Sequence, residues 1–154
     1  MGRGTLKLAV LFAAGALAFA YFLQYAVGIE PCNLCWWQRY PYMAIIPVGI
    51  IALLSGRIGL GLAVILLLFL ADAGVAWYHG GVEAGIFALP EGCNSRLGAT
   101  TVEELRAQLL NAAPACDQVA ASFLGLSLSV WNAIGASLMA IIVAVGLLRS
   151  RRAG

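Results

Sequence analysis

Four long apolar segments constrain the fold of this chain more than any other feature. They run from about residue 6 to 29, 36 to 54, 58 to 78 and 126 to 148. Each is near the roughly 20 residues that a helix needs to cross about 30 Å of hydrocarbon. Because lipid offers the backbone no hydrogen-bond partner, each segment is expected to be helical. The sequence therefore predicts an all-α fold, a four-helix transmembrane bundle.

The composition agrees with a membrane protein. Of the 154 residues, 62% are hydrophobic and 10% are charged, whereas a soluble domain is about 45–50% apolar and about 25% charged. So few charges cannot cover the apolar surface in water, so the bilayer is the expected solvent. A single membrane domain over residues 1–154 is predicted. The net charge of +2 is small, so no nucleic-acid partner is expected.

The start of the first segment also resembles a secretory signal peptide. Ala18, Phe19 and Ala20 match the small-residue pattern of a cleavage site. The apolar core of a signal peptide is about 7–15 residues long, and this run continues past Ala20 to about residue 29. An uncleaved helix is therefore favoured.

The basic residues predict the orientation in the membrane. Six of them share one side of a four-helix path, and no acidic residue joins them: Arg3, Lys7, Arg57, Arg149, Arg151 and Arg152. The positive-inside rule places this side, with both termini, in the cytoplasm. The connecting segments at about 30–35 and 79–125 then face outward.

The longer outer segment, about residues 79–125, is too long for a turn and too polar for the hydrocarbon. Within it, Thr101 and Glu104 fit a capping box, and apolar residues follow at helical spacing. The segment is expected to carry a short amphipathic helix at about residues 102–110, lying on the membrane surface. A small packed helix that never touches lipid is the alternative.

All four cysteines lie in the two outer segments: Cys32, Cys35, Cys93 and Cys116. A zinc site with four cysteines usually has two close pairs; the chain has one, so no metal is expected. Structural disulfides suit the distant pair but not the C-x-x-C, whose small ring removes little loop entropy. A redox relay between the two pairs is favoured. The long loop is expected to keep its sulfurs accessible, as thiol–disulfide exchange requires.

Cys35 lies at the N-terminal edge of the second predicted helix. The exposed N–H groups and the helix dipole there are expected to lower the thiol pKa from about 8.5 and favour the thiolate. Arg39 follows one turn later on the same face. It either snorkels to headgroups or polarises an electron acceptor beside Cys35. Such an acceptor would be planar and dissolved in the membrane, where the surrounding aromatic residues enclose it.

Three other polar residues lie near or within the helices. His79, just beyond the third predicted helix, is either a contact to the acceptor or a plain interfacial histidine. Glu83 is expected to be an exposed loop acid. Asp72 lies inside the third segment, where an unpaired charge is costly. It is expected to be either neutral or bonded to a neighbouring helix, in a structural role. Small residues are expected to permit close helix packing: Gly59, Gly61, Gly135, Ala136 and Ser137.

The residues around the C-x-x-C resemble the signature of the disulfide bond formation protein B (DsbB) family. Residues 31–41 carry the resemblance, and residues 77–83, 123–126 and 131–132 extend it in the same order over nearly the whole chain. C-x-x-C-x-x-x-R with a later cysteine pair is specific, whereas a lone C-x-x-C is weak. The vitamin K epoxide reductase-like enzymes are similar, but their loop cysteines precede the C-x-x-C. A membrane scaffold with structural disulfides is the non-enzymatic alternative.

The resemblance implies a quinone-dependent oxidoreductase of the bacterial inner membrane, with periplasmic cysteines, acting in protein folding. A reduced thioredoxin-like oxidase of the DsbA type would attack Cys93 of a Cys93–Cys116 disulfide. Cys116 would then attack Cys32, releasing the Cys35 thiolate beside a bound ubiquinone or menaquinone. Arg39 and His79 are the implied quinone-binding residues.

Overall fold

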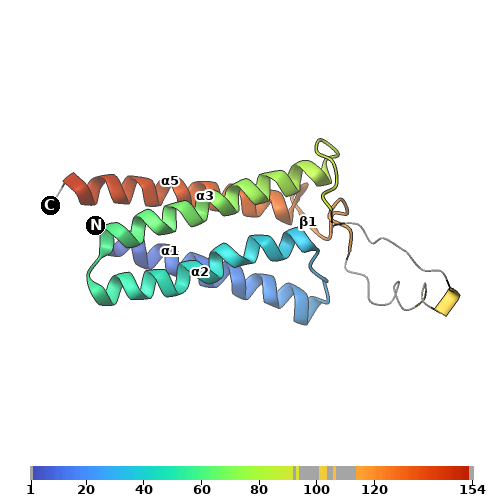
Figure 1. The fold of residues 1–154 in the computed structure, drawn as a ribbon, viewed down its shortest axis with the longest axis horizontal. Coiled ribbons are helices and arrows are strands. Elements are labelled where there is room, and N and C mark those ends of the chain that lie inside the picture. The colour runs from blue at the N-terminus through green and yellow to red at the C-terminus, as the bar shows by residue number, and fades with distance from the viewer. Residues whose placement is uncertain (1, 92, 94–100, 104–105, 107–113, 153–154) are drawn as a thin grey trace.

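The computed structural model describes residues 2–91, 93, 101–103, 106 and 114–152, which form a bundle of long helices (Figure 1). Helix α1 (Gly2–Phe22) continues into a short π-helix, η1 (Leu23–Val27). The other long helices are α2 (Asn33–Ser55), α3 (Ile58–Glu83) and α5 (Leu128–Arg152). Two-residue strands β1 (Ser122–Phe123) and β2 (Leu126–Ser127) pair antiparallel just before α5. The prediction of an all-helical chain is confirmed, with this small hairpin added.

Among the described residues, three helical segments are long and apolar enough to cross a membrane. They are Gly2–Val27, Ile58–Glu83 and Leu128–Ser150. Helix α2 has 23 residues but is not among them; its first turns carry Gln38 and Arg39. The crossing by α2 therefore stays a prediction.

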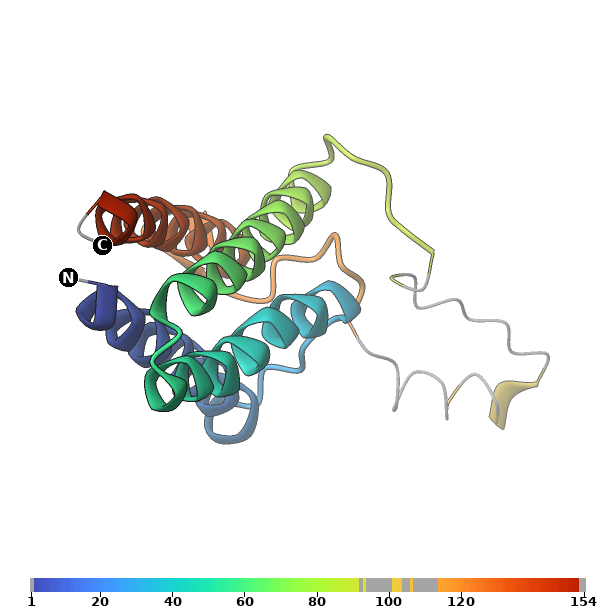
Figure 2. The same ribbon diagram turned by 60° about the vertical axis from the view of Figure 1, so that its left-hand side comes forward.

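The helices run lengthwise, so the connections gather at the two ends of the bundle (Figures 1 and 2). The start of α1, the end of α5 and the α2–α3 turn lie at one end. The α1–α2 link, the end of α3 and the start of α5 lie at the other. Helix α3 packs against both α5 and α2, and α1 packs mainly against α2. The turn is tight because Gly56 takes a φ of 72°, a left-handed conformation without steric cost for glycine. The basic end and the cysteine-bearing end of the chain are thus separated by the length of the bundle.

The core is built from apolar residues at helical spacing and from small residues that let helices approach. In α1, the buried residues Leu6, Ala9, Ala13 and Leu17 share one face. Between α2 and α3, Gly61 lies directly against Ala52. Close contact of this kind stabilises helix pairs where lipid, rather than water, surrounds them. Gly135 likewise lies against Phe12, whereas a Cβ on Gly59 would meet nothing within 4 Å, so Gly59 does not act as expected.

Helix α3 extends further than the sequence predicted, and this corrects two expectations. The predicted loop began at residue 79, but α3 continues to Glu83. The glycines at its end are enclosed: Gly80 lies against Val130, and Gly81 lies against Phe87. Packing therefore compensates for the low helix propensity of glycine. His79 and Glu83 are consequently helical residues that face the bundle.

The predicted amphipathic helix at about residues 102–110 falls mostly outside the described residues. Residues 104, 105 and 107–110 are among those the structure does not describe. The helix, and its position on the membrane surface, stay predictions.

Substitution of Gly61 by alanine should destabilise the bundle. The added methyl group would overlap Ala52, and overpacking of this kind costs about 1–3 kcal/mol. Thermal unfolding of the detergent-solubilised protein measures the loss. Gly74→Ala is the matched control in the same helix, because a Cβ there meets nothing within 4 Å. Equal melting temperatures for the two variants would contradict this account of the α2–α3 contact.

Candidate functional site

The C-x-x-C motif forms the N-terminus of α2. Cys32 is the N-cap, in an extended conformation, and its Sγ accepts the backbone N–H of Cys35 at 3.3 Å. The thiol of Cys32 therefore satisfies a backbone group that the helix leaves without a partner. The two sulfur atoms are free thiols 3.0 Å apart. The sequence placed Cys35 at the helix edge, but the helix begins earlier and Cys32 holds that position.

This difference reverses the expected charge distribution in the dithiol. The pKa of Cys32 is lowered to about 4, first because the Cys35 thiol donates a hydrogen bond to it and next because His79 does, while burial opposes both. The pKa of Cys35 is raised by that same hydrogen bond, by burial and by the negative charge on Cys32. The expectation of a Cys35 thiolate is therefore wrong for this state, because Cys32 receives the helix N–H and the hydrogen bonds.

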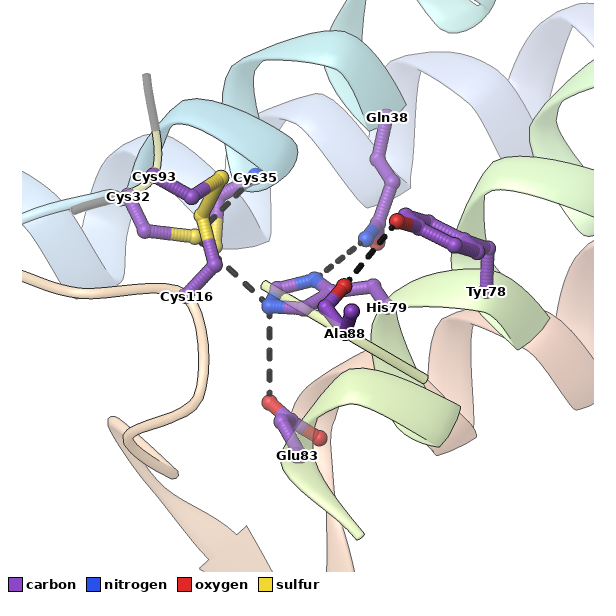
Figure 3. Close-up of a disulfide and its surroundings, with 9 residues drawn as sticks. All are labelled: Cys32, Cys35, Gln38, Tyr78, His79, Glu83, Ala88, Cys93 and Cys116. Atoms are coloured by element: carbon purple, nitrogen blue, oxygen red, sulfur yellow. Dashed lines mark hydrogen bonds and ion pairs between the residues drawn. A yellow bond between two sulfur atoms is a disulfide. The ribbon is translucent and has the colours of Figure 1, made fainter. Parts of the chain in front are cut away.

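The second cysteine pair lies directly on the first. Cys93 and Cys116 form a disulfide with a Cα–Cα distance of 5.3 Å, and the Cys116 N–H donates to the Cys93 carbonyl. Both are buried in one cluster with Cys32, and Leu89 packs against it. Figure 3 shows the disulfide beside the C-x-x-C sulfurs. Cys93 is only 4% exposed, so the expectation of an accessible loop sulfur is wrong for this arrangement.

His79 connects the C-x-x-C to α3. Its Nε2 lies 3.6 Å from Cys32 Sγ and 3.6 Å from Glu83 Oε1 (Figure 3). Ser129 donates a hydrogen bond to the other oxygen of Glu83. His79 is 2% exposed, and the side chain of Glu83 is 7% exposed. Neither the interfacial histidine nor the exposed loop acid is found, because α3 carries both side chains into the bundle.

A series of buried polar groups, not predicted from the sequence, leads to His79. Asn132 donates through Nδ2 to Asp72 at 3.2 Å and to Gln38 Oε1 at 3.0 Å, and it accepts from the Tyr42 hydroxyl at 2.6 Å. Gln38 Nε2 lies 2.7 Å from His79 Nδ1. Polar residues inside apolar helices were the available signal. Asp72 is bonded to a neighbouring helix, as expected.

The hydrogen bonds of Asn132 and Gln38 determine which nitrogen of a neutral His79 carries the proton. The Gln38 carbonyl already accepts from Asn132, so its amide N–H₂ is left to donate to His79 Nδ1. Nδ1 is then an acceptor, and the ring proton lies on Nε2. That nitrogen faces Cys32 and Glu83.

Arg39 is held against α1. Its guanidinium donates to Gln24 Oε1 at 2.6 Å and to the Ala20 carbonyl at 3.4 Å. It also lies 4.7 Å from the ring centroid of Trp36 and 5.0 Å from that of Tyr21, distances at which cation–π attraction operates. At 7% exposure the side chain is buried, and it does not extend outward as a snorkelling arginine would.

A cavity of about 290 Å³ lies beside these groups. Residues of α1, α2, α3 and α5 line it, mostly through apolar side chains such as Leu17 and Leu128. Its polar wall includes Cys35, Arg39 and His79. Small-molecule sites combine an apolar lining with a few converging polar groups in this way, usually with about 300–1,000 Å³. The cavity therefore combines room for a small apolar molecule with polar side chains on one wall.

Comparison with known proteins gives a consistent result. The family model described as "Disulfide bond formation protein DsbB" matches residues 2–146. Disulfide bond formation protein B of Marinobacter nauticus is 32% identical, over 96% of this chain and 92% of its own. The protein of that name from Aromatoleum aromaticum is 35% identical, over 90% and 87%. A third, from Azoarcus sp., is 32% identical over 97% and 95%.

The lowered pKa of Cys32 predicts how the reduced protein reacts with iodoacetamide. Because only the thiolate reacts, the rate at Cys32 should change little above about pH 5 and fall at lower pH, as the thiol is protonated near pH 4. Cys35 should stay unmodified in early samples. Mass spectrometry of peptides from timed reactions measures both rates.

His79→Ala should move the fall in the Cys32 rate to higher pH, because it removes a hydrogen bond that lowers the pKa. Tyr78→Phe is the matched control, since the Tyr78 hydroxyl, at an exposed position, donates to the Ala88 carbonyl and to no cysteine of the described residues. If iodoacetamide modified Cys35 before Cys32 at acidic pH, the assignment of the thiolate to Cys32 would be refuted.

Proposed function

This chain belongs to the disulfide bond formation protein DsbB family, and we propose that it reoxidises a periplasmic thioredoxin-like oxidase of the DsbA type and passes two electrons to a membrane quinone. Family membership makes it a multi-pass membrane protein and an oxidoreductase of disulfide formation. One observation supports the proposed path of the electrons from the partner to the quinone. The loop disulfide packs on Cys32, and Cys35, Cys32's partner in the C-x-x-C, lines the cavity.

We place the protein in the bacterial inner membrane with four crossings and with both termini in the cytoplasm. At about 1.5 Å per residue, the 23 residues of α2 span about 35 Å, enough for the hydrocarbon even if the crossing begins near residue 36. The basic residues at the ends of α1, α3 and α5 support this orientation. The cysteines then face the periplasm, where disulfides persist.

The first exchange takes place at the loop disulfide. A thiolate of the reduced partner attacks Cys93, forming a mixed disulfide and releasing Cys116 as a thiolate. Because Cys93 is buried against Cys32, the loop must move away from α2 before the partner can reach it. The displaced Cys116 thiolate then attacks Cys32 of a Cys32–Cys35 disulfide, and Cys35 leaves. Each exchange breaks one S–S bond and forms one, so the electron pair moves inward without loss.

The causes of the pKa shifts explain why Cys35 can ionise at that stage. In the dithiol, the Cys35 pKa is raised mainly by its hydrogen bond to Cys32, and also by burial and by the charge of the Cys32 thiolate. Once Cys32 is bonded to Cys116, that hydrogen bond and that charge are gone. The positive charge of Arg39, which lowers the pKa of Cys35, then acts against burial alone. The relay itself therefore makes Cys35 a thiolate at the cavity wall.

The cavity residues fit a quinone ring, and Arg39 and His79 are the proposed donors to its carbonyl oxygens. A bound ubiquinone or menaquinone would take up two electrons and two protons and leave as the quinol. The bonds from Arg39 to Gln24 and Ala20 fix its guanidinium before a ring enters, which reduces the entropy lost on binding.

Before the quinone is reduced, the second thiolate of the partner attacks its mixed disulfide with Cys93, so the partner leaves oxidised and Cys93 is freed. Cys93 then attacks Cys116, which restores the Cys93–Cys116 disulfide and releases Cys32 beside Cys35 as a dithiol, the state seen here. This dithiol gives up two electrons and two protons when it returns to the Cys32–Cys35 disulfide, so the count of electrons and protons balances.

The family match favours this function over the vitamin K epoxide reductase-like enzyme and over the scaffold. The C-x-x-C precedes the loop pair in this chain, which is opposite to the order of the vitamin K enzymes. A scaffold would not need a thiol at the wall of an apolar cavity.

The direct test is catalytic oxidation of a reduced thioredoxin-like oxidase by the purified protein with ubiquinone. We expect multiple turnovers, and we expect Cys35→Ser and Cys93→Ser each to abolish them, because each removes a sulfur that the electron pair must pass. Loss of ubiquinone absorbance and partner thiol content are followed together. Full activity in either variant would rule the mechanism out. Cys32→Ser and Cys116→Ser remove the other two sulfurs of the relay and should also abolish turnover.

The role of Arg39 has a separate test. Arg39→Ala should raise the KM for ubiquinone by roughly 10–100-fold, because a charged hydrogen bond contributes about 1.5–3 kcal/mol. The KM for the protein partner should change little, since Arg39 faces the cavity. Arg57→Ala, in the turn at the opposite end of the bundle, is the matched control. An unchanged KM for ubiquinone in Arg39→Ala would exclude the residue from quinone binding.

A further inference from the structure

Three metal-ligating atoms converge at the N-terminus of α2. Among the described residues, Cys32 Sγ, Cys35 Sγ and His79 Nε2 all lie within 4.8 Å of one another. The cysteine spacing alone offers a zinc ion no second close pair. His79 is 47 positions from Cys32 and reaches it only through the packing of α3 against α2, so the sequence does not reveal this group.

The distances suit a tetrahedral ion. With Zn–S bonds of about 2.3 Å and Zn–N bonds of about 2.0 Å, tetrahedral geometry separates a sulfur from a nitrogen by about 3.5 Å and two sulfurs by about 3.8 Å. Cys32 Sγ and His79 Nε2 are already 3.6 Å apart. The sulfurs are 3.0 Å apart, so Cys35 must rotate its side chain slightly away. Two thiolates and one imidazole are a ligand set that zinc prefers.

A fourth ligand is available beside these three. Glu83 Oε1 lies 3.6 Å from His79 Nε2, close to the separation of about 3.4 Å expected for nitrogen and oxygen ligands on one zinc ion. Ser129 holds the other oxygen of this carboxylate, so Oε1 is the oxygen left to face the ion. Two thiolates neutralise the charge of Zn²⁺, and the Glu83 carboxylate adds one negative charge. The positive charge of Arg39, which acts on Cys35, partly offsets it.

We propose that the reduced chain binds one Zn²⁺ through Cys32, Cys35 and His79, with Glu83 as the fourth ligand. Binding exchanges the two thiol protons for the metal and moves no electrons. In the disulfide form neither sulfur is a thiolate, so the site exists only in the dithiol state. The occupied site keeps the sulfurs reduced, and zinc therefore inhibits any oxidation that uses Cys32 and Cys35.

The site also requires a particular orientation of Gln38. A zinc ion on Nε2 leaves the proton of His79 on Nδ1, and this N–H needs an acceptor. The Gln38 side chain, 2.7 Å from Nδ1, supplies its carbonyl oxygen when the amide turns over. Asn132 then loses one acceptor but still donates to Asp72. Gln38 is thus the outer partner that orients the metal-binding histidine.

The test uses the Cys93→Ser/Cys116→Ser double variant, in which Cys32 and Cys35 are the remaining thiols. The reduced protein in detergent is titrated with zinc sulfate against a chromophoric chelator, without quinone or protein partner. We expect one Zn²⁺ per chain, no binding after oxidation to the Cys32–Cys35 disulfide, and weaker binding as the pH falls. In this background, Gln38→Leu should weaken binding about 10–100-fold, and His79→Ala by at least as much.

Tyr78→Phe in the same background is the control, and its affinity should not change. Zinc X-ray absorption on the double variant itself, independent of any change at His79, should show two sulfur and two nitrogen or oxygen ligands. Four sulfur ligands, binding weaker than the chelator can report, or an unchanged affinity in His79→Ala would each overturn the proposal. Because neither quinone nor partner is present, these results stand apart from the outcome of the activity assay.

Discussion

The hydrogen bond from the Cys35 N–H to the Cys32 thiol is the interaction on which the rest of the site depends. It caps α2, so it determines where the helix starts and which cysteine lies outside it. Cys32 consequently faces the loop disulfide and His79, while Cys35 lies one turn further and faces the cavity. The two sulfurs of one motif thereby have different neighbours, and a relay between a protein partner and a membrane-dissolved acceptor requires that asymmetry.

Buried hydrogen bonds between the helices orient the side chains of the site. The hydrogen bonds from Asn132 to Asp72 and Gln38 join α5 to α3 and α2. Gln38 in turn orients the His79 ring through its hydrogen bond to Nδ1. In a bundle surrounded by lipid, apolar packing alone discriminates poorly between rotations of a helix. Satisfied polar groups in a low dielectric do discriminate, because each wrong rotation leaves them unpaired. The network therefore selects one arrangement of the helices and one tautomer of the histidine.

The same cluster of sulfurs and imidazole connects the two proposals. Thiolate character makes Cys32 a good nucleophile and leaving group, and it also makes the dithiol a ligand for soft metals. Packing of the loop disulfide over Cys32 limits access from outside. An enzyme that must expose a reactive dithiol in each cycle is open to metal capture during that interval, and burial shortens the exposure without removing it.

The sequence by itself determined the helical segments, the grouping of both cysteine pairs at one end and the family. These follow from local properties: segment length, hydropathy, charge distribution and the spacing C-x-x-C-x-x-x-R. It could not determine that α3 continues to Glu83, that Cys32 rather than Cys35 caps α2, or that Gln38 and Asn132 align His79. Those outcomes depend on contacts between residues dozens of positions apart, which form only when α2, α3 and α5 pack together. Local sequence properties therefore determined the helical segments. Long-range packing determined which cysteine is the thiolate and which side chains surround it.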